Sequence, residues 1–158
     1  FCVVTISWVE QYNYSVEHKI AKSYGIIPIF KDGTKYNILI VQNSKGGHWG
    51  LPKGTPENSE LPMQTATREL QEETGIKEKD IQVQENPVFL ERYSFEQNGV
   101  VYDKTNTYYI GFVEAMTVGE DLDEVNVAEW VSLEEAKEKL THEEIIKVVE
   151  GLEIYLNA

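Results

Sequence analysis

Hydrophobic residues follow a two-residue period in the first well-patterned part of the chain. Apolar and β-branched side chains dominate residues 23–30 and 36–42, and the polar segment KDGTK separates the two runs. Asp32 and Gly33 lie at the centre of that segment, where a tight turn needs them. The pattern predicts a β-hairpin that begins near Lys22.

A second pair of strands is predicted further along the chain. Residues 87–95 and 100–115 are rich in aromatic and β-branched side chains, which favour strands. The segment between them contains Asn-Gly at 98–99, a strong signal for a two-residue hairpin turn. An acidic loop, 117–126, then leads to a short predicted strand at 127–132.

Helical spacing replaces the strand pattern after a loop rich in glycine and proline, residues 43–59. Ser59 is a suitable N-cap, Pro62 falls in the first turn where a missing N–H is harmless, and Gly75 is suited to end the helix. These signals predict a helix over residues 60–74.

Two further amphipathic helices are predicted at the C-terminal end. Each begins with a capping-box pair, Ser132 with Glu135 and Thr141 with Glu144. Their apolar faces are formed by Leu133, Ala136 and Leu140, and by Ile145, Ile146, Val148, Val149 and Leu152. Strands mixed with a central helix and C-terminal helices predict an α/β sandwich.

The bulk composition narrows the possible functions. A length of 158 residues suits one domain. The net charge of -13 disfavours a protein that holds long nucleic acid by phosphate neutralisation, since that mode needs a basic face. A small anionic ligand held through bound cations remains compatible with this charge.

The first residues carry a weaker pattern than the rest. Residues 1–20 alternate only weakly between apolar and polar side chains, so we assign them to an N-terminal extension of uncertain status and residues 21–158 to the domain.

The extension has neither the basic leader nor the cleavage site of a secretory signal, and the chain has no apolar run of membrane-spanning length. The single cysteine, Cys2, fits a reducing compartment, so a cytoplasmic protein without membrane contact is expected. The oligomeric state is not indicated.

Three glutamates on the predicted central helix are the strongest chemical feature. Each helical residue turns by about 100°, so Glu69, Glu72 and Glu73 project from one third of the circumference. Like charges this close repel, so a cation is expected beside them; carboxylate oxygens suit Mg²⁺ or Mn²⁺. Three glutamates alone also fit a solvated face with ordinary pairs such as Arg68 with Glu72. The neighbouring apolar stripe consists of Met63, Ala66 and Leu70.

The spacing of the whole segment separates these two interpretations. It reads Gly54, five residues, Glu60, seven residues, Arg68-Glu69-Leu70, one residue, Glu72-Glu73, one residue, Gly75-Ile76. At every constrained position this resembles the Nudix box of hydrolases that cleave nucleoside diphosphates linked to another moiety. The resemblance covers roughly residues 20–155 and implies the Nudix α/β/α sandwich with a mixed central sheet, a catalytic loop-helix-loop and C-terminal helices.

The same resemblance implies roles for individual residues. Glu69, Glu72 and Glu73 would be the ligands of Mg²⁺ or Mn²⁺, and a water molecule would attack phosphorus while the cations offset the developing charge.

The structural positions of the box have implied roles as well. Gly54 would let the loop approach the helix, Glu60 and Arg68 would brace the loop against the helix, and Gly75 would end it.

The residue that accepts the proton of the attacking water varies among Nudix branches. Glu73 is one candidate, with Glu72 beside it in the catalytic set. Glu124 is another, because several family members carry an additional acidic residue in the loop before the final strand. Its neighbours Glu120, Asp121 and Asp123 are substitutes for that role, and a merely acidic loop is the alternative.

The residues that flank the box favour a branch of the family. HWGLPKG, residues 48–54, is similar to a segment shared by asymmetrical diadenosine tetraphosphate hydrolases and RNA 5′-pyrophosphohydrolases, which makes Lys53 a candidate phosphate ligand. Tyr93 matches a tyrosine of the diadenosine polyphosphate hydrolases on which a base could stack. Lys104 matches a basic position of that branch, and His48 is a weaker candidate for a phosphate hydrogen bond. Thr55 stands where the family pattern has histidine, so the substrate stays open.

We therefore expect a Mg²⁺-dependent hydrolase whose substrate is a small nucleotide polyphosphate, with diadenosine tetraphosphate, cleaved to ATP and AMP, ranked first. Removal of 5′-pyrophosphate from RNA ranks second, because 14 basic residues against 27 acidic ones leave little positive surface for an RNA 5′ end. Other nucleoside-diphosphate-linked substrates rank third. A non-catalytic nucleotide-binding module is the alternative from another class, and the intact set of box acids argues against it.

Overall fold

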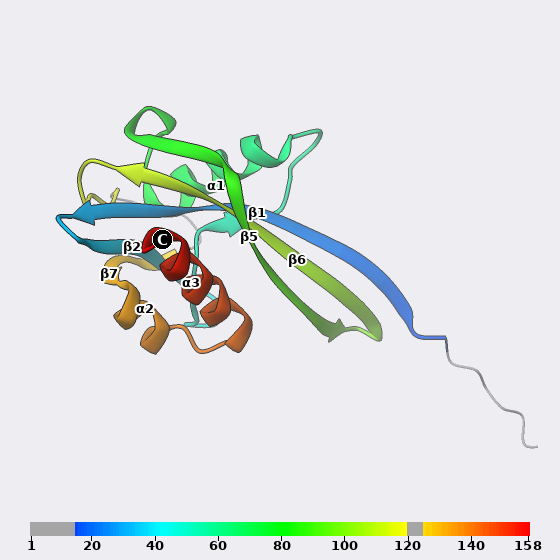
Figure 1. The fold of residues 1–158 in the computed structure, drawn as a ribbon. Helices are drawn as coiled ribbons and strands as arrows, with labels where there is room; N and C mark the ends of the chain where they lie inside the picture. The colour runs from blue at the N-terminus through cyan, green and yellow to red at the C-terminus, as the bar shows by residue number, and fades with distance from the viewer. Residues whose placement is uncertain (1–14, 120–124) are drawn as a thin grey trace, which may run out of the picture.

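The computed structural model describes residues 15–119 and 125–158. A central sheet lies between α1 on one face and α2 with α3 on the other (Figure 1). This arrangement confirms the predicted α/β/α sandwich. In chain order, the elements are β1 (Glu17–Asp32), β2 (Lys35–Asn43), β3 (Trp49–Gly50), β4 (Lys53–Gly54), α1 (Pro62–Thr74), the 3₁₀ helix η1 (Glu78–Asp80), β5 (Ile81–Gln97), β6 (Val100–Val113), β7 (Val125–Ser132), α2 (Leu133–Lys139) and α3 (Glu143–Leu156).

The sheet is mixed, as expected. Its strands follow the order β3-β2-β1-β6-β5, with β7 paired to β2 and β4 paired to β1. β1 and β6 run parallel, and the other strand pairs are antiparallel. Both predicted hairpins are present, and the second turns at Asn98 and Gly99, whose φ angles of 51° and 76° are those that a two-residue hairpin turn requires.

The core has two parts because both faces of the sheet are covered. On β2, Ile38 and Ile40 belong to the cluster that includes Val148 of α3, whereas Leu39 belongs to the cluster that includes Leu70 of α1. Successive strand residues point to opposite faces, so a strand covered on both sides needs apolar residues at consecutive positions. The continuous run ILIV at 38–41 is therefore a direct consequence of the sandwich.

Strand β1 is longer than the sequence pattern predicts. It begins at Glu17, so residues 17–20, which we assigned to the extension, lie in the sheet. The reason is backbone pairing: β1 pairs with β6 from Glu17 opposite Val100 onward, and the ladder does not need apolar side chains. Residues 1–14 of the expected extension, Cys2 among them, lie outside the described residues. The division into extension and domain stays a prediction.

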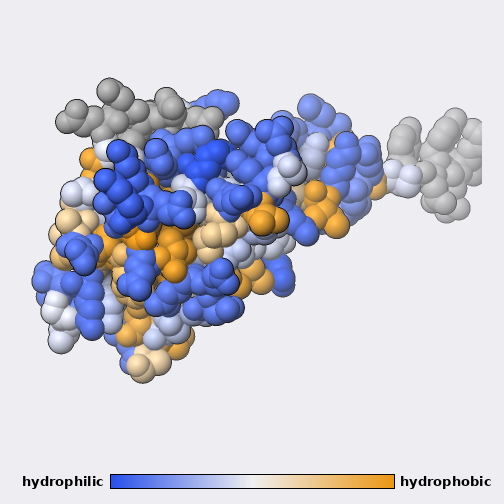
Figure 2. All heavy atoms as spheres, turned by 90° about the horizontal axis from the view of Figure 1, so that it is seen from above, coloured by the Kyte–Doolittle hydropathy of each residue, from blue (hydrophilic) through white to orange (hydrophobic). Residues whose placement is uncertain are grey.

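The paired ends of β1, β5 and β6 project from the body of the molecule (Figure 1). We call residues 17–23, 92–97 and 100–105 the arm. Its side chains are mostly polar or partly exposed, and apolar residues appear among hydrophilic ones on its surface (Figure 2). Ile20 is 78% exposed and Phe95 is 40% exposed. This solvent exposure explains why hydrophobic patterning did not reveal the start of β1.

Two predicted helix starts are wrong. α1 begins at Pro62 with Leu61 as its N-cap, not Ser59, because the Gln64 side chain accepts a hydrogen bond from the Leu61 N–H at 2.8 Å. α3 begins at Glu143 with His142 as N-cap, and no side chain caps it. The predicted pair of Thr141 and Glu144 therefore does not form a capping box.

The other C-terminal helix begins as predicted. The Ser132 hydroxyl accepts a hydrogen bond from the Glu135 N–H at 3.1 Å, and the Glu135 carboxylate accepts one from the Ser132 N–H at 2.8 Å. This capping box is confirmed, and it starts α2 directly after β7. In the part of the chain that the structure describes, no helix has both the length and the apolar character needed to span a membrane.

Strand β5 also begins earlier than predicted, at Ile81 rather than at residue 87. Ile81 is buried and pairs with Val113, and the register shifts between Gln84 and Phe89, where the Asn86–Pro87 peptide bond is cis. Proline cannot donate to a ladder, so it is tolerated at such an irregularity. The predicted strand began at residue 87, after the irregularity, and therefore omitted the first part of β5.

Candidate active site

Arg68 lies at the centre of the acidic residues of α1. Its Nε and Nη2 donate to the two carboxylate oxygens of Glu60 at 2.6 and 3.1 Å. Its Nη1 donates to Glu69 at 3.0 Å and to Glu72 at 3.1 Å. We call Glu60, Arg68, Glu69 and Glu72 the Arg68 cluster. Part of the positive charge that the glutamates require is therefore supplied by the chain itself.

The Arg68 cluster fastens the loop that precedes α1 to the helix. Arg68 Nη2 also donates to the carbonyl oxygen of Thr55 at 3.1 Å, and the Thr65 hydroxyl donates to Glu60 at 2.8 Å. The hydrogen bond from Arg68 lowers the pKa of Glu60 from 4.5 to about 2, and the same bond raises the pKa of Arg68. A bidentate contact of this kind fixes the relative orientation of the Arg68 and Glu60 side chains and also pairs their charges.

Gly54 makes the close approach of loop and helix possible. A Cβ atom at this position would lie 1.9 Å from the carboxylate of Glu69, so any side chain would collide with it. Glu69 is only 7% exposed. At the other end of the helix, Gly75 adopts φ of 75°, and its N–H donates to the Gln71 carbonyl at 2.9 Å. Glycine tolerates both demands at little steric cost.

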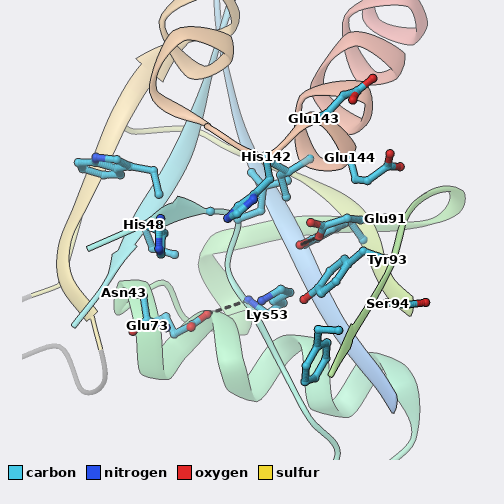
Figure 3. Close-up of a pocket in the computed structure, with 17 residues that line it drawn as sticks. Asn43, His48, Lys53, Glu73, Glu91, Tyr93, Ser94, His142, Glu143 and Glu144 are labelled. Atoms are coloured by element: carbon cyan, nitrogen blue, oxygen red, sulfur yellow. Dashed lines mark hydrogen bonds between the residues drawn. The ribbon is translucent and has the colours of Figure 1, made fainter. Parts of the chain in front are cut away.

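A cavity of about 650 Å³ opens beside the C-terminal half of α1. The Lys53 N–H donates to Glu73 Oε2 at 2.8 Å on one side of it (Figure 3). β5 contributes Glu91 and Tyr93 from another side, and the start of α3 contributes His142 above them (Figure 3). The cavity therefore joins the box helix, the loop before it and the strand β5.

Four of the residues selected from the sequence line this cavity together: His48, Lys53, Glu73 and Tyr93. The Tyr93 ring is 39% exposed and lies 6.2 Å from the Phe95 ring, centroid to centroid. The four cavity residues come from segments separated by up to 45 positions in the sequence, so the fold brings them together.

Lys104 is placed differently. Lys104 does not belong to the cavity lining; its Nζ donates to the Ser23 hydroxyl. Burial lowers the pKa of Lys104, and the nearby charge of Lys53 lowers it further. Glu124, with Glu120, Asp121 and Asp123, lies outside the described residues, so its proposed role stays a prediction.

Sequence reasoning missed several residues of the cavity, above all Glu91. This carboxylate is 6% exposed and accepts hydrogen bonds from Asn106 at 2.8 Å and from Tyr108 at 2.9 Å. Burial, together with the Glu91 charge, raises the pKa of Tyr108, so the phenol keeps its proton and donates it. The sequence signal that could have identified Glu91 was its spacing from Tyr93. Glu91 precedes Tyr93 by two residues, which places both on the same face of β5.

His142 was also missed, because nothing in the sequence connects it to His48. In the structure the two imidazole rings lie 5.4 Å apart, centroid to centroid, at the same cavity. The contact joins the loop after β2 to the start of α3.

The carboxylates of α1 fit a divalent cation by their chemistry. Glu69, Glu72 and Glu73 supply hard oxygen donors from one helix, and Mg²⁺ and Mn²⁺ prefer such donors. In residues 15–119 and 125–158, no group of three His, Cys, Asp or Glu side chains gathers closely enough to enclose a metal. The Arg68 cluster explains why the α1 carboxylates do not gather in this way, because hydrogen bonds from Arg68 hold Glu69 and Glu72. The donor set fits, and the guanidinium competes with a cation for two of its members.

Known proteins resemble this chain over most of its length. The family model described as NUDIX domain matches residues 19–152. The asymmetrical bis(5′-nucleosyl)-tetraphosphatase of Sus scrofa is 35% identical over 109 residues, which is 66% of this chain and 70% of that protein. The mRNA-decapping protein g5R of African swine fever virus (isolate Pig/Kenya/KEN-50/1950) is 31% identical over 98 residues, which is 60% of this chain but only 39% of the viral protein.

Solved structures share the fold. The crystal structure of a C. elegans Ap4A hydrolase binary complex superposes with a TM-score of 0.75 at 24% identity and covers 87% of this chain and 98% of that one. The NUDIX domain of Shewanella oneidensis NrtR complexed with ADP ribose gives a TM-score of 0.69 at 17% identity, with 92% of this chain and 94% of that chain covered. Together with the family match and the box geometry, these findings show that the chain belongs to the Nudix hydrolase family.

Proposed function

We propose that this chain is a Mg²⁺-dependent hydrolase that cleaves a phosphoric anhydride of a dinucleoside polyphosphate, with diadenosine tetraphosphate converted to ATP and AMP. The observation that carries the proposal is the cavity. It brings a lysine of the box loop, a glutamate of the box helix and an exposed tyrosine ring to one space of about 650 Å³. That size suits a nucleotide, and the three groups suit its phosphates, its cation and its base.

Each group of the chain has a distinct task in this proposal. Glu69, Glu72 and Glu73 would hold Mg²⁺, or Mn²⁺, which when bound offsets charge on the phosphate oxygens and makes water a better nucleophile. The Lys53 side chain carries a compact positive charge for the phosphate chain. Tyr93 offers a ring face on which the base stacks.

The proton of the attacking water needs an acceptor on the chain. Glu73 is our first candidate, because the hydrogen bond from the Lys53 N–H to Glu73 Oε2 fixes its carboxylate at the cavity. Glu124 is the second candidate. In either case the proton moves to a carboxylate oxygen as the water oxygen bonds to phosphorus, and the anhydride P–O bond breaks to release the other nucleotide.

The relatives support two substrates unequally. The tetraphosphatases of Sus scrofa and Rattus norvegicus share 35% and 34% identity with this chain, and it covers 70% and 76% of their lengths. The viral decapping protein supports the second candidate, removal of a 5′-terminal group from RNA, over a shorter part of its length. The net charge of -13 favours the smaller substrate.

The substrate is tested by comparing two separate reactions at the same Mg²⁺ concentration. The purified chain is incubated with diadenosine tetraphosphate and, separately, with 5′-triphosphorylated RNA, and the products are separated by ion-exchange chromatography. We expect ATP plus AMP from the first substrate, at a kcat/KM at least about tenfold higher than for the RNA. A tenfold preference for the RNA reverses the assignment.

The variant Glu73→Gln separates an enzyme from a nucleotide-binding module. It keeps the size of the side chain but removes its charge, so we expect kcat for diadenosine tetraphosphate to fall by about a thousandfold. The matched control is Glu85→Gln, an exposed carboxylate outside the cavity lining, which should retain full activity. Full activity in Glu73→Gln would show that the metal assignment is wrong.

A further inference from the structure

Glu91 is a buried carboxylate that neither the box nor the proposed metal set explains. It lies on β5, lines the cavity and is 6% exposed. One of its oxygens, Oε2, accepts two hydrogen bonds, from Asn106 Nδ2 at 2.8 Å and from the Tyr108 hydroxyl at 2.9 Å. Both donors belong to fully buried residues of the neighbouring strand β6. The Glu91 side chain is therefore held in one orientation.

The second oxygen, Oε1, is available. Hydrogen bonds to Glu91 within residues 15–119 and 125–158 all end on Oε2. In the same residues, the enclosed side-chain polar atom that lacks a partner is Asn106 Oδ1, so Oε1 is not enclosed. Glu91 points from its strand into the cavity (Figure 3). The structure thus presents one carboxylate oxygen, without a donor, to any molecule that enters.

Asn106 shows how firmly this arrangement is imposed. Its amide directs Nδ2 toward Glu91 and leaves its own Oδ1 buried without a partner. An unsatisfied buried acceptor costs about 1–3 kcal/mol. The Asn106 amide keeps this orientation because the Glu91 carboxylate needs a hydrogen-bond donor there. Tyr108 is likewise restricted to donating, since a carboxylate oxygen only accepts.

Tyr93 determines which part of a ligand reaches Glu91. The two residues are separated by one position on β5, so their Cα atoms are about 7 Å apart on the same face of the sheet. A base that stacks on the Tyr93 ring therefore directs one edge toward Glu91. A lone acceptor at that edge is complementary to an amino group and repels a carbonyl oxygen.

We propose that Glu91 Oε1 accepts a hydrogen bond from the exocyclic amino group of a nucleobase stacked on Tyr93, so that the cavity selects adenine over purines that lack this group. The inference rests on the proposed function for its ligand class. It adds a specificity-determining residue that lies outside the Nudix box.

The test measures binding rather than turnover. Isothermal titration of the wild-type chain compares AMP with purine riboside 5′-monophosphate, which is AMP without its amino group. We expect AMP to bind about tenfold more tightly, as one hydrogen bond to a charged acceptor predicts. A third ligand, 2′-deoxy-AMP, distinguishes the base from the sugar, and its affinity should stay within twofold of that of AMP.

The variant Glu91→Gln makes the prediction sharper. Asn106 and Tyr108 both donate, so the glutamine must turn its oxygen toward them and its NH₂ group toward the cavity. The position then offers a donor, and the variant should bind IMP, which carries a carbonyl oxygen in place of the amino group, at least threefold more tightly than AMP. The matched control is Glu143→Gln, an 82%-exposed carboxylate at the same cavity, which should keep the wild-type preference.

The outcomes separate this inference from the proposed function. Equal wild-type binding of AMP and its deaminated analogue, absence of AMP binding, or loss of affinity confined to 2′-deoxy-AMP overturns the role of Glu91. If the amino preference is found but diadenosine tetraphosphate is not hydrolysed, the proposed reaction fails while the role of Glu91 stands. Thermal melting of each variant accompanies the titrations, and the wild-type comparison needs no variant.

Discussion

The Arg68 cluster and the surroundings of Glu91 solve the same physical problem in two ways. Both place glutamates where water is partly or wholly excluded, and a carboxylate in such a place needs compensation. In the Arg68 cluster, a guanidinium offsets the charge through four hydrogen bonds to three carboxylates. Around Glu91, two neutral groups donate the hydrogen bonds, and Lys104 lies close enough for the Glu91 charge to raise its pKa.

The difference has a functional meaning. A carboxylate neutralised by arginine is fixed in place, and it can exchange that partner for a cation. A carboxylate held by donors to one of its oxygens has its other oxygen open, so it can recognise a polar group on a ligand. In the proposed function, the helix therefore carries the chemistry and β5 carries the selectivity.

Removing the guanidinium is expected to have the largest effect on stability. Arg68→Met leaves Glu60, Glu69 and Glu72 close together without their shared partner, so their mutual repulsion should lower the free energy of unfolding. Urea unfolding followed by circular dichroism measures the loss. The control is Arg92→Met, an exposed arginine on β5, which should change the free energy of unfolding by less than about 0.5 kcal/mol. Equal effects of the two substitutions would remove the structural role of Arg68.

The corresponding change at the other site is Glu91→Leu. It leaves the donors of Asn106 and Tyr108 buried without an acceptor, which should lower the free energy of unfolding by about 2 kcal/mol. The double variant Glu91→Leu with Asn106→Leu tests the cause, because removing both partners should recover part of the loss. Stability unchanged in Glu91→Leu contradicts the described network.

Tyr93→Ala tests whether β5 contributes to substrate binding while α1 contributes to the chemical step. Loss of base stacking should raise KM for diadenosine tetraphosphate about fivefold, which corresponds to about 1 kcal/mol, and should change kcat by less than twofold. Steady-state kinetics with Tyr155→Ala, an exposed tyrosine of α3 outside the cavity lining, provides the comparison. A fall in kcat with constant KM would place Tyr93 in the chemical step instead.

The smallest expected effect is a dependence on pH. The pKa of Glu60 is lowered from 4.5 to about 2 by the hydrogen bond from Arg68, so the ionised pair stabilises the fold above pH 4.5. That contribution is lost as the pH falls from 4.5 through about 2. Glu60→Gln should therefore show a shallower decline of the urea midpoint over this interval than the wild type. Identical slopes would mean that the pair contributes nothing.

The contrast also shows how much of the site the sequence contained. The members of the Arg68 cluster lie within thirteen positions, on one loop and one helix, so their spacing alone predicted that they would meet. Glu91 meets Asn106 and Tyr108 across a strand pair whose register shifts between Gln84 and Phe89. No local pattern contains that register, so the contact could not be predicted.

The fold shows the same division between local and non-local information. Apolar runs predicted the strands whose side chains are buried, as on β2. The first residues of β1 gave no such signal, because their place in the sheet depends on backbone pairing with β6. The N-cap of α1 was misassigned because the Leu61 N–H donates to the Gln64 side chain, so the helix starts after Leu61 rather than at Ser59.

The arm has a consequence for how such a protein changes over evolutionary time. Its three strands pair in continuous register, and Tyr93 and Phe95 of the arm line the cavity. Two residues added to each strand would lengthen the arm by about 7 Å and keep every side chain on its present face, whereas one added residue would turn the faces over. Mutation can therefore adjust the reach of the arm in even steps while the helix, its carboxylates and the core stay unchanged.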